Sequence, residues 1–268
     1  MVALDGAAFI DRAWVFLSQL VGIFAVQRIF TLRATASSAV LWAWALVPIY
    51  AAHQFEEHGW DALGRRYAFL EYFNSQALPR ALGVALTPRL ITVINAGITW
   101  FSFPLVALWT ERSGDAAPAA LLWGIAAANA AGAHCLVALL SWSYNPGLAT
   151  SALLMGPASV FALRSLTHVK YAAPPSRQAV VVASPISHKP WEKGTRDKRL
   201  LAAALLTGGP LCHGVLMLLP LYLVGQGKLS VTMFARIWLF GTSALPLAIA
   251  HAIRRAPPAA VDARPKTA

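Results

Sequence analysis

The sequence predicts an all-α fold, a multi-pass bundle of transmembrane helices. Of the 268 residues, 57% are hydrophobic and 12% are charged, and the mean hydropathy is +0.57. This composition is too apolar for one soluble domain of this length. About seven segments have the roughly 20 apolar residues needed to cross ~30 Å of hydrocarbon. They lie near residues 10–30, 36–54, 86–109, 118–142, 147–165, 199–225 and 231–252.

The first segment is the weakest of these predicted spans. Its apolar core, from Trp14 to Val26, is short and contains Ser18 and Gln19. A segment of this kind can lie in the membrane interface instead, which would leave six spans.

The segment after the second span, residues 55–80, mixes apolar and basic residues. Its apolar positions recur at helical spacing, which predicts an amphipathic helix lying on the outer membrane surface. These positions are Trp60, Leu63, Tyr67, Leu70 and Phe73.

The basic residues orient the bundle. Fifteen of the 22 lysines and arginines fall on one side of the predicted spans and seven on the other. The larger group is expected in the cytoplasm, which places the N-terminus outside and the C-terminus inside. Asp5 and Asp11 precede the first span, where a cleaved signal peptide would be basic. The net charge of +11 therefore reflects membrane topology, and we expect no nucleic-acid partner.

Composition also divides the chain. Residues 1–165 are expected to form a membrane domain, and residues 199–255 two further transmembrane helices. Between them, residues 166–198 form a basic, proline- and serine-containing stretch typical of a cytoplasmic linker, and residues 256–268 form a disordered tail. Two cysteines within apolar segments support no disulfide framework.

A cluster of ionisable residues ends the second span, with the sequence His53-Gln54-Phe55-Glu56-Glu57-His58. The chain has only eleven acidic residues, and a carboxylate at bilayer depth costs roughly 2.5–3.5 kcal/mol. On a helix, Glu56 and Glu57 both flank His53, and Trp60 extends the same stripe, whereas His58 points elsewhere. We expect this stripe to face a cavity, an ion or a proton path.

The fourth span carries a second polar stripe toward the same end of the bundle. Asn129 lies five residues before His134 and therefore falls off the stripe on an α-helix, while Asn95 lies midway along the third span. The stripe consists of His134, Ser141, Tyr144 and Asn145.

The sequence Tyr144-Asn145-Pro146-Gly147 predicts the start of the fifth span. Asn is a favoured N-cap and Pro is favoured at the first helical position. Free amides at such a helix start favour a nearby anion.

Together these motifs resemble the HXXEE family of integral membrane proteins, over about residues 36–165. The resemblance rests on His53-x-x-Glu56-Glu57, on the downstream Asn95, Asn129 and His134, and on Tyr144-Asn145-Pro146-Gly147. It implies a membrane domain built around these residues and supplies no reaction.

The residues favour a membrane-embedded enzyme acting on a lipid or isoprenoid-like substrate. In one route, a glutamate and a histidine transfer protons, as in an isomerase, a cyclase or an epoxide-opening enzyme. In the other, a divalent metal such as zinc is held by His53, His134 and Glu56 or Glu57, for hydrolysis. We favour the first route slightly. The candidate catalytic residues are His53, Glu56, Glu57, His134, Tyr144 and Asn145, and the candidate substrate-binding residues are Asn95, Asn129 and Trp60.

Two alternatives stay open, a proton-coupled transporter or carrier and a non-catalytic scaffold whose basic linker binds anionic lipid. The chain shows no repeat symmetry, and its polar residues gather at one side rather than at the midplane, which argues against transport. The expected partners are membrane lipid and a hydrophobic small molecule.

Overall fold

The computed structural model describes residues 6–81, 83–167 and 197–255, and these form helices without a β-sheet. Two helices come first, α1 (Gly6–Leu32) and α2 (Ser38–His58), followed by the short α3 (Ala68–Ser75) and α4 (Ala77–Ala81). The next four long helices each contain a π-helical segment, and α13 ends the described chain. Their bounds are α5 (Pro88–Gly97), η1 (Ile98–Ser102), α6 (Phe103–Ser113); α7 (Ala117–Ala128), η2 (Asn129–Leu136), α8 (Val137–Ser141); α9 (Leu148–Thr150), η3 (Ser151–Met155), α10 (Gly156–Leu166); α11 (Lys198–Leu206), η4 (Thr207–Leu218), α12 (Leu219–Gly225); and α13 (Val231–Arg255).

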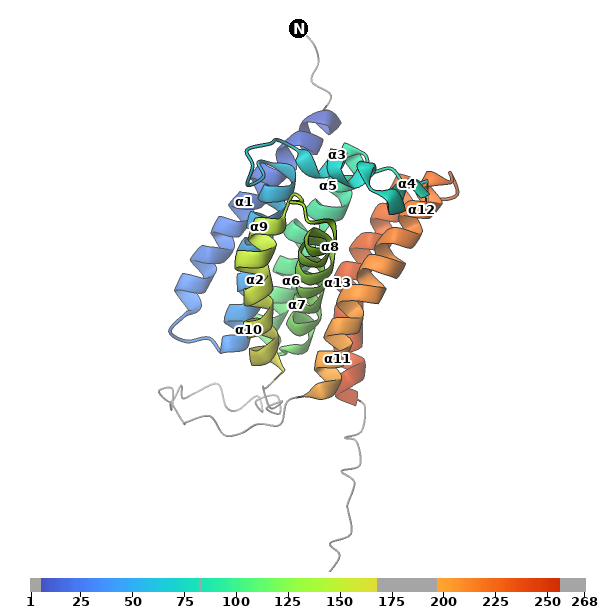
Figure 1. Ribbon diagram of the computed structural model, residues 1–268. Helices are drawn as coiled ribbons and strands as arrows, with labels where there is room; N and C mark the ends of the chain where they lie inside the picture. The colour runs from blue at the N-terminus through green and yellow to red at the C-terminus, as the bar shows by residue number, and fades with distance from the viewer. Residues whose placement is uncertain (1–5, 82, 168–196, 256–268) are drawn as a thin grey trace, which may run out of the picture.

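The predicted all-α multi-pass architecture is confirmed. Six helices in the described part of the chain are long and apolar enough to cross a membrane, and α1 is one of them. Helix α2 is not among the six, because its last turns carry polar and acidic side chains, but its 21 residues pack against α1 within the bundle (Figure 1). The six are Phe9–Leu32, Pro88–Ser113, Ala117–Ser141, Leu148–Leu166, Lys198–Gly225 and Val231–Ile253.

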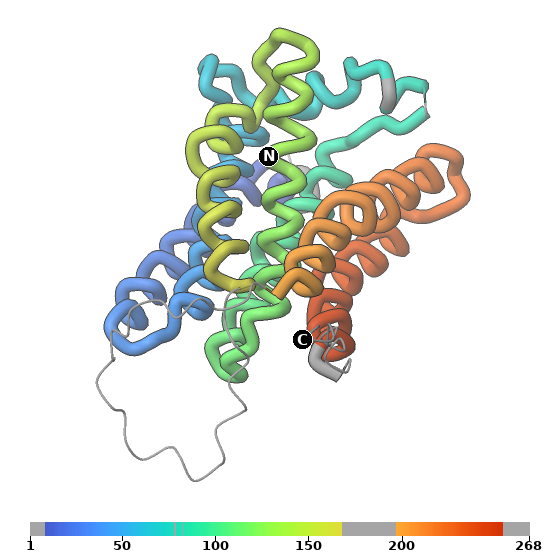
Figure 2. The backbone as a smooth tube through the Cα atoms, turned by 60° about the horizontal axis from the view of Figure 1, so that its bottom comes forward, coloured from blue at the N-terminus to red at the C-terminus, as the bar shows by residue number. Residues whose placement is uncertain are grey.

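The two ends of the bundle carry different elements. The end of α2, helices α3 and α4, and the turn before α9 share the end at which α1 begins, here named the site end (Figure 1). Helix α13 finishes at the opposite end. Figure 2 shows α11–η4–α12 and α13 as a pair beside the other helices, against which they pack through α7 and α5. The cytoplasmic location of the end opposite the site end stays a prediction, and the predicted linker and tail lie almost wholly outside the described residues.

The amphipathic helix predicted over residues 55–80 is present only in part, as the short helices α3 and α4. Helix α2 continues through His58, and a turn separates it from α3, which lies across the site end (Figure 1). Asp61 closes this turn, because its carboxylate accepts hydrogen bonds from the amides of Leu63 and Arg65 and pairs with the Arg65 side chain. Local hydrogen bonds of this kind compete with helix.

Helix α7 is the centre of the bundle, and every residue from Ala117 to Ala126 is buried. Its small residues let the α11–η4 helix approach backbone to backbone. A Cβ atom on Gly124 would overlap the carbonyl of Ala204, and one on Gly208 would overlap the carbonyl of Gly124. Close approach through small residues is a common way of packing helices in lipid, where apolar surface alone does not drive association.

We expect Gly208→Ala to destabilise the protein by about 1–3 kcal/mol, because its methyl group must displace backbone atoms of α7. Gly209→Ala is the matched control, since a Cβ there meets no atom within 4 Å. Thermal unfolding in detergent would measure both. Equal stability of the two variants would contradict the close approach of η4 to α7.

Candidate functional site

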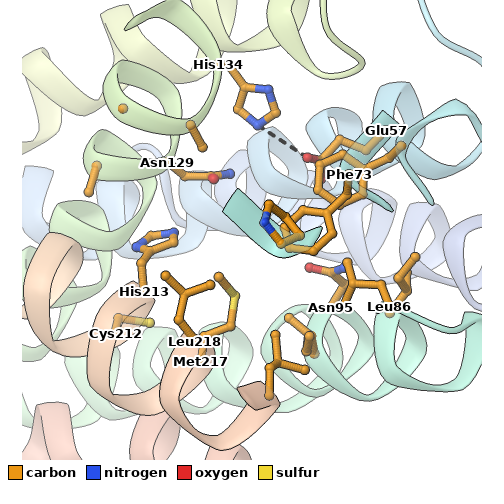
Figure 3. Close-up of a pocket in the computed structure, with 18 of the residues that line it drawn as sticks. Glu57, Phe73, Leu86, Asn95, Asn129, His134, Cys212, His213, Met217 and Leu218 are labelled. Atoms are coloured by element: carbon orange, nitrogen blue, oxygen red, sulfur yellow. Dashed lines mark ion pairs between the residues drawn. The ribbon is translucent and has the colours of Figure 1, made fainter. Parts of the chain in front are cut away.

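One carboxylate and two imidazoles meet at the site end of the bundle. His53 and Glu57 are one turn apart on α2, and their Nε2 and Oε2 atoms are 3.5 Å apart. His134, from η2, places Nε2 3.2 Å from Glu57 Oε1 (Figure 3). All three residues are buried, and one ligand atom from each lies within 4.8 Å of the others. We name His53, Glu57 and His134 the His/Glu cluster.

The hydrogen-bond network assigns the tautomer of His134. The Asn145 amide nitrogen donates to the backbone carbonyl of His134, at 3.0 Å, so its Oδ1 is the atom that faces the ring. His134 Nδ1 therefore carries a hydrogen and donates it to Asn145 Oδ1, at 2.8 Å. This bond turns His134 Nε2 toward Glu57.

The tautomer of His53 follows in the same way. The Thr150 hydroxyl donates to Glu56 Oε2, so it can only accept from His53 Nδ1, which is 3.0 Å away. His53 Nε2 then faces the cluster as an acceptor, and Asn129 Nδ2 donates to it at 3.0 Å. Both histidines thus direct Nε2 inward and anchor Nδ1–H on an oxygen acceptor.

The remaining contacts of Glu57 are polar. Gln54 donates to its Oε2 at 2.7 Å, and His58 Nε2 lies 3.5 Å from the same oxygen. His134 Nε2, in contrast, is buried and makes no hydrogen bond of acceptable geometry, although Glu57 is close.

Glu56 points away from the cluster, so the predicted metal and catalytic sets are not assembled in full. Its carboxylate accepts hydrogen bonds from the Tyr144 hydroxyl at 2.8 Å, the Ala149 amide at 2.9 Å, and the amide and hydroxyl of Thr150. The anion expected at the start of the fifth span is thus present, and it is Glu56. These bonds use the orphan amides of a helix start, which gives Glu56 the geometry of a structural anchor.

The burial of Tyr144 and its contact with Glu56 raise the pKa of the phenol. The hydroxyl therefore stays protonated over the neutral range and donates to Glu56 throughout it. Tyr144 also accepts a hydrogen bond from the Ala62 amide, at 3.1 Å, which ties the turn after α2 to the turn before α9.

The predicted N-cap at Asn145 is wrong, because its side chain binds His134 and α9 begins at Leu148 with Gly147 as the N-cap. Gly147 has φ +93°, and a Cβ there would lie 2.6 Å from His134 Cε1, 2.8 Å from His53 Cε1 and 2.9 Å from Glu57 Cγ. The backbone at Gly147 therefore covers the cluster directly, at a distance that only glycine allows.

Asn129 joins the site through the π-helix η2. On an α-helix, a spacing of five residues puts Asn129 and His134 on different faces. In a π-helix the backbone bonds from i to i+5, so both side chains face α2 and the cavity beside it (Figure 3). The same change in winding removes Ser141 from the predicted stripe; it is exposed and bonded to Val137 and Ser143.

An apolar cavity of about 650 Å³ adjoins the cluster. Glu57, Asn95, Asn129, His134 and, from η4, His213 supply polar side chains to its lining (Figure 3). The rest of its lining is mainly aliphatic and aromatic, and includes Phe73, Leu86, Ile94, Met217, Leu218 and Trp238. Asn95 and Asn129, the candidate substrate-binding residues, thus both lie at the cavity.

Trp60, predicted to bind substrate, does not line this cavity. Its ring packs against Phe16 and Phe55 and lies under the Arg66 guanidinium. The predicted stripe assumed that the α-helix continues to Trp60, but α2 ends at His58.

Sequence reasoning missed other residues of the site. His58 was expected to point elsewhere, but it is buried, with Nε2 3.2 Å from Asn95 Nδ2. Gln54 and Gly147 contact the cluster directly. Gln54 and His58 could have been found from the sequence, because they stand between or beside the ionisable residues of the motif. The role of Gly147 follows only from its three-dimensional position.

Fold and site together define a polytopic helical membrane protein with a buried His/Glu cluster at the end of an apolar cavity. Residues 44–162 match a family model described as "Protein of unknown function with HXXEE motif". The expected HXXEE resemblance is therefore confirmed for the segment that holds the whole His/Glu cluster. No curated protein and no solved structure matches the chain. Helices α11–α13, which supply one wall of the cavity, lie outside the matched segment.

We expect Gly147→Ala to displace the His/Glu cluster and to lower the unfolding temperature in detergent by several degrees. Gly114→Ala is the matched control, because Gly114 has a similar φ of +71° and open space around its Cβ position. The control isolates the cost of the left-handed backbone, about 1–2 kcal/mol. An equal loss in both variants would show that the backbone of residue 147 does not press on the cluster.

Tyr144→Phe removes a hydrogen bond to an ionised carboxylate and should destabilise the protein by about 1–2 kcal/mol. Because the folded pKa of Tyr144 lies above its ordinary value of 10.0, this contribution is complete below about pH 10 and is lost as pH rises through the folded pKa. Unfolding temperatures at about pH 6 to 9 should therefore show a constant difference from wild type. Tyr67→Phe, at an exposed tyrosine of the same end, should show none.

Proposed function

We propose that the protein is a membrane-embedded enzyme that acts on a lipid or isoprenoid-like substrate, with the His/Glu cluster at the reacting end. The observation that carries this proposal is the position of the cluster, at the polar side of an otherwise apolar cavity. A substrate with a long hydrocarbon part and one reactive polar group fits such a lining.

The cavity has a size typical of binding sites. Its volume of about 650 Å³ lies within the usual range of roughly 300–1,000 Å³ for small-molecule pockets. Pockets of this kind combine an apolar lining with a few convergent polar groups that orient the ligand. Asn95, Asn129 and His213 are suited to that second task, since each presents a polar side chain to the cavity.

The polar side of the cavity contains groups able to do chemistry. Glu57 and His134 both line the cavity, and His53 lies behind them. Proton transfer between Glu57 and His134 and the activation of a water by a bound ion would both use this side of the cavity. Tyr144, Asn145 and Glu56 act as positioning residues in this proposal, because they hold the cluster or its neighbouring turn.

The packing of α7 favours an enzyme over a transporter. Leu121, Leu122 and Trp123 are completely buried, and the Trp123 indole donates to the Trp42 carbonyl at 2.9 Å. The part of this helix that lines the cavity begins at Ile125. Along α7, an apolar stretch thus lies between the cavity and the opposite end of the bundle, where a transport path beside this helix would need polar groups.

Lipid extracts from cells that express wild-type protein or Glu57→Gln should differ. We expect one apolar species to be depleted and a product to accumulate with wild type alone, as measured by mass spectrometry. Glu71→Gln is the matched control, because Glu71 is an exposed carboxylate on α3 at the same end. Identical extracts from all three strains, with no lipid bound to the purified protein, would contradict the proposal.

Gly132→Leu should lower turnover of long-chain substrates without affecting folding. Gly132 lines the cavity, and a Cβ there meets no atom within 4 Å, so we expect the larger side chain to extend into open space at the cavity with little displacement of protein. The measurement is the same product yield together with the unfolding temperature. Unchanged yield in a folded Gly132→Leu protein would place the substrate elsewhere.

A further inference from the structure

We propose that His53, Glu57 and His134 bind one divalent transition-metal ion, through the two Nε2 atoms and the Glu57 carboxylate. This inference deepens the proposed function by naming a cofactor for the same site. It rests on the geometry of the cluster and stands without any assumption about the lipid.

Two separations between donor atoms are close to those that a shared ion needs. Ligand atoms about 2.1 Å from a tetrahedral zinc ion lie roughly 3.4 Å from each other. Glu57 lies 3.2 Å from His134 Nε2 through Oε1 and 3.5 Å from His53 Nε2 through Oε2. One ligand atom from each of the three residues lies within 4.8 Å of the others. Closing around an ion therefore needs a small inward movement, in which Asn129 Nδ2 gives up its hydrogen bond to the His53 Nε2 lone pair.

The surroundings of His134 Nε2 are the second observation that points to an ion. His134 Nε2 is buried without a hydrogen bond, and an unsatisfied polar atom of this kind costs about 1–3 kcal/mol. A bound cation would use this lone pair, which already faces Glu57 across 3.2 Å.

The outer bonds of both histidines match those of metal ligands. A ligating histidine almost always donates its other ring N–H to an oxygen acceptor, which fixes its tautomer and orientation. Here Asn145 Oδ1 accepts from His134 and Thr150 Oγ1 accepts from His53. The two imidazoles are therefore oriented with their lone pairs inward.

Charge also favours a cation. In the described part of the chain, the ion-pair partners of Glu57 are all histidines, each neutral unless it takes up a proton. A carboxylate this buried is costly without a counter-charge. One divalent ion supplies that charge with both histidines neutral.

The donor set indicates the class of ion. Two imidazole nitrogens with one carboxylate suit zinc or iron(II), whereas calcium and magnesium prefer oxygen ligands throughout. Three protein ligands also leave a coordination position for water. Because Glu57 and His134 both line the cavity, that position is expected to face the substrate.

The test is the metal content of the untagged full-length protein purified in detergent. We expect about one zinc or iron per chain by mass spectrometry, either as purified or after incubation with zinc or iron(II) and removal of the excess. Glu57→Gln and His134→Gln should each lower this at least fivefold. The controls Glu71→Gln and His251→Ala change exposed residues of the same types and should keep the wild-type content.

Cobalt(II) absorption of the wild-type protein keeps the test decisive if the cluster variants do not fold. Nitrogen and carboxylate ligands in a four- or five-coordinate site give intense visible bands that aqueous cobalt lacks, and one equivalent of zinc should abolish them. Less than a tenth of an ion per chain after reconstitution, with no such bands, would overturn the proposal. So would full metal content in folded Glu57→Gln and His134→Gln proteins.

The two proposals fail separately. Stoichiometric metal without any change in the lipid extracts would support the ion site and contradict the enzyme. Lipid conversion by a protein free of metal would support the enzyme, with proton transfer as its chemistry, and contradict the ion site.

Discussion

The burial of the Glu57 carboxylate is the constraint on which the site depends. Removing a carboxylate from water is costly unless charge and hydrogen bonds replace the water. Gln54 from the same helix supplies a hydrogen bond, and three imidazoles surround the group. His53 and His134 are themselves held by Asn129, Asn145 and Thr150, from two helices and a turn, and His58 by Asn95. The contacts between α2, η2 and the start of α9 therefore follow largely from one buried charge.

The adjacent residues Glu56 and Glu57 differ in their surroundings. Side chains of consecutive helical residues point about 100° apart, so Glu56 and Glu57 face different neighbours although their sequence context is the same. Glu56 meets the free amides of α9 and the Tyr144 hydroxyl, and four hydrogen bonds satisfy it. Glu57 meets only imidazoles and one amide. The difference in available donors makes one carboxylate an anchor and leaves the other with capacity to bind or react.

The bundle and most of the site could be predicted from the sequence, because apolar length and the spacing of polar residues are local properties. Six predicted spans appear as helices of sufficient length and hydropathy, and His53, Glu57, His134, Asn95 and Asn129 lie at one site. The misplacements of Asn129, Ser141 and Trp60 share a cause, since they assume one uninterrupted α-helical period. The π-helix η2 changes that period between Asn129 and His134, and the turn closed by Asp61 ends the stripe before Trp60. Neither feature leaves a pattern that α-helical periodicity could detect.

The cavity is built from two parts of the chain, one inside and one outside the segment that matches the family model. The His/Glu cluster comes from the matched segment, residues 44–162, whereas Met217, Leu218 and Trp238 belong to helices beyond it. Changes in these last helices would alter the length and shape of the cavity without touching the His/Glu cluster. Under the proposed function, such a division would let one reaction be combined with different preferences for substrate length.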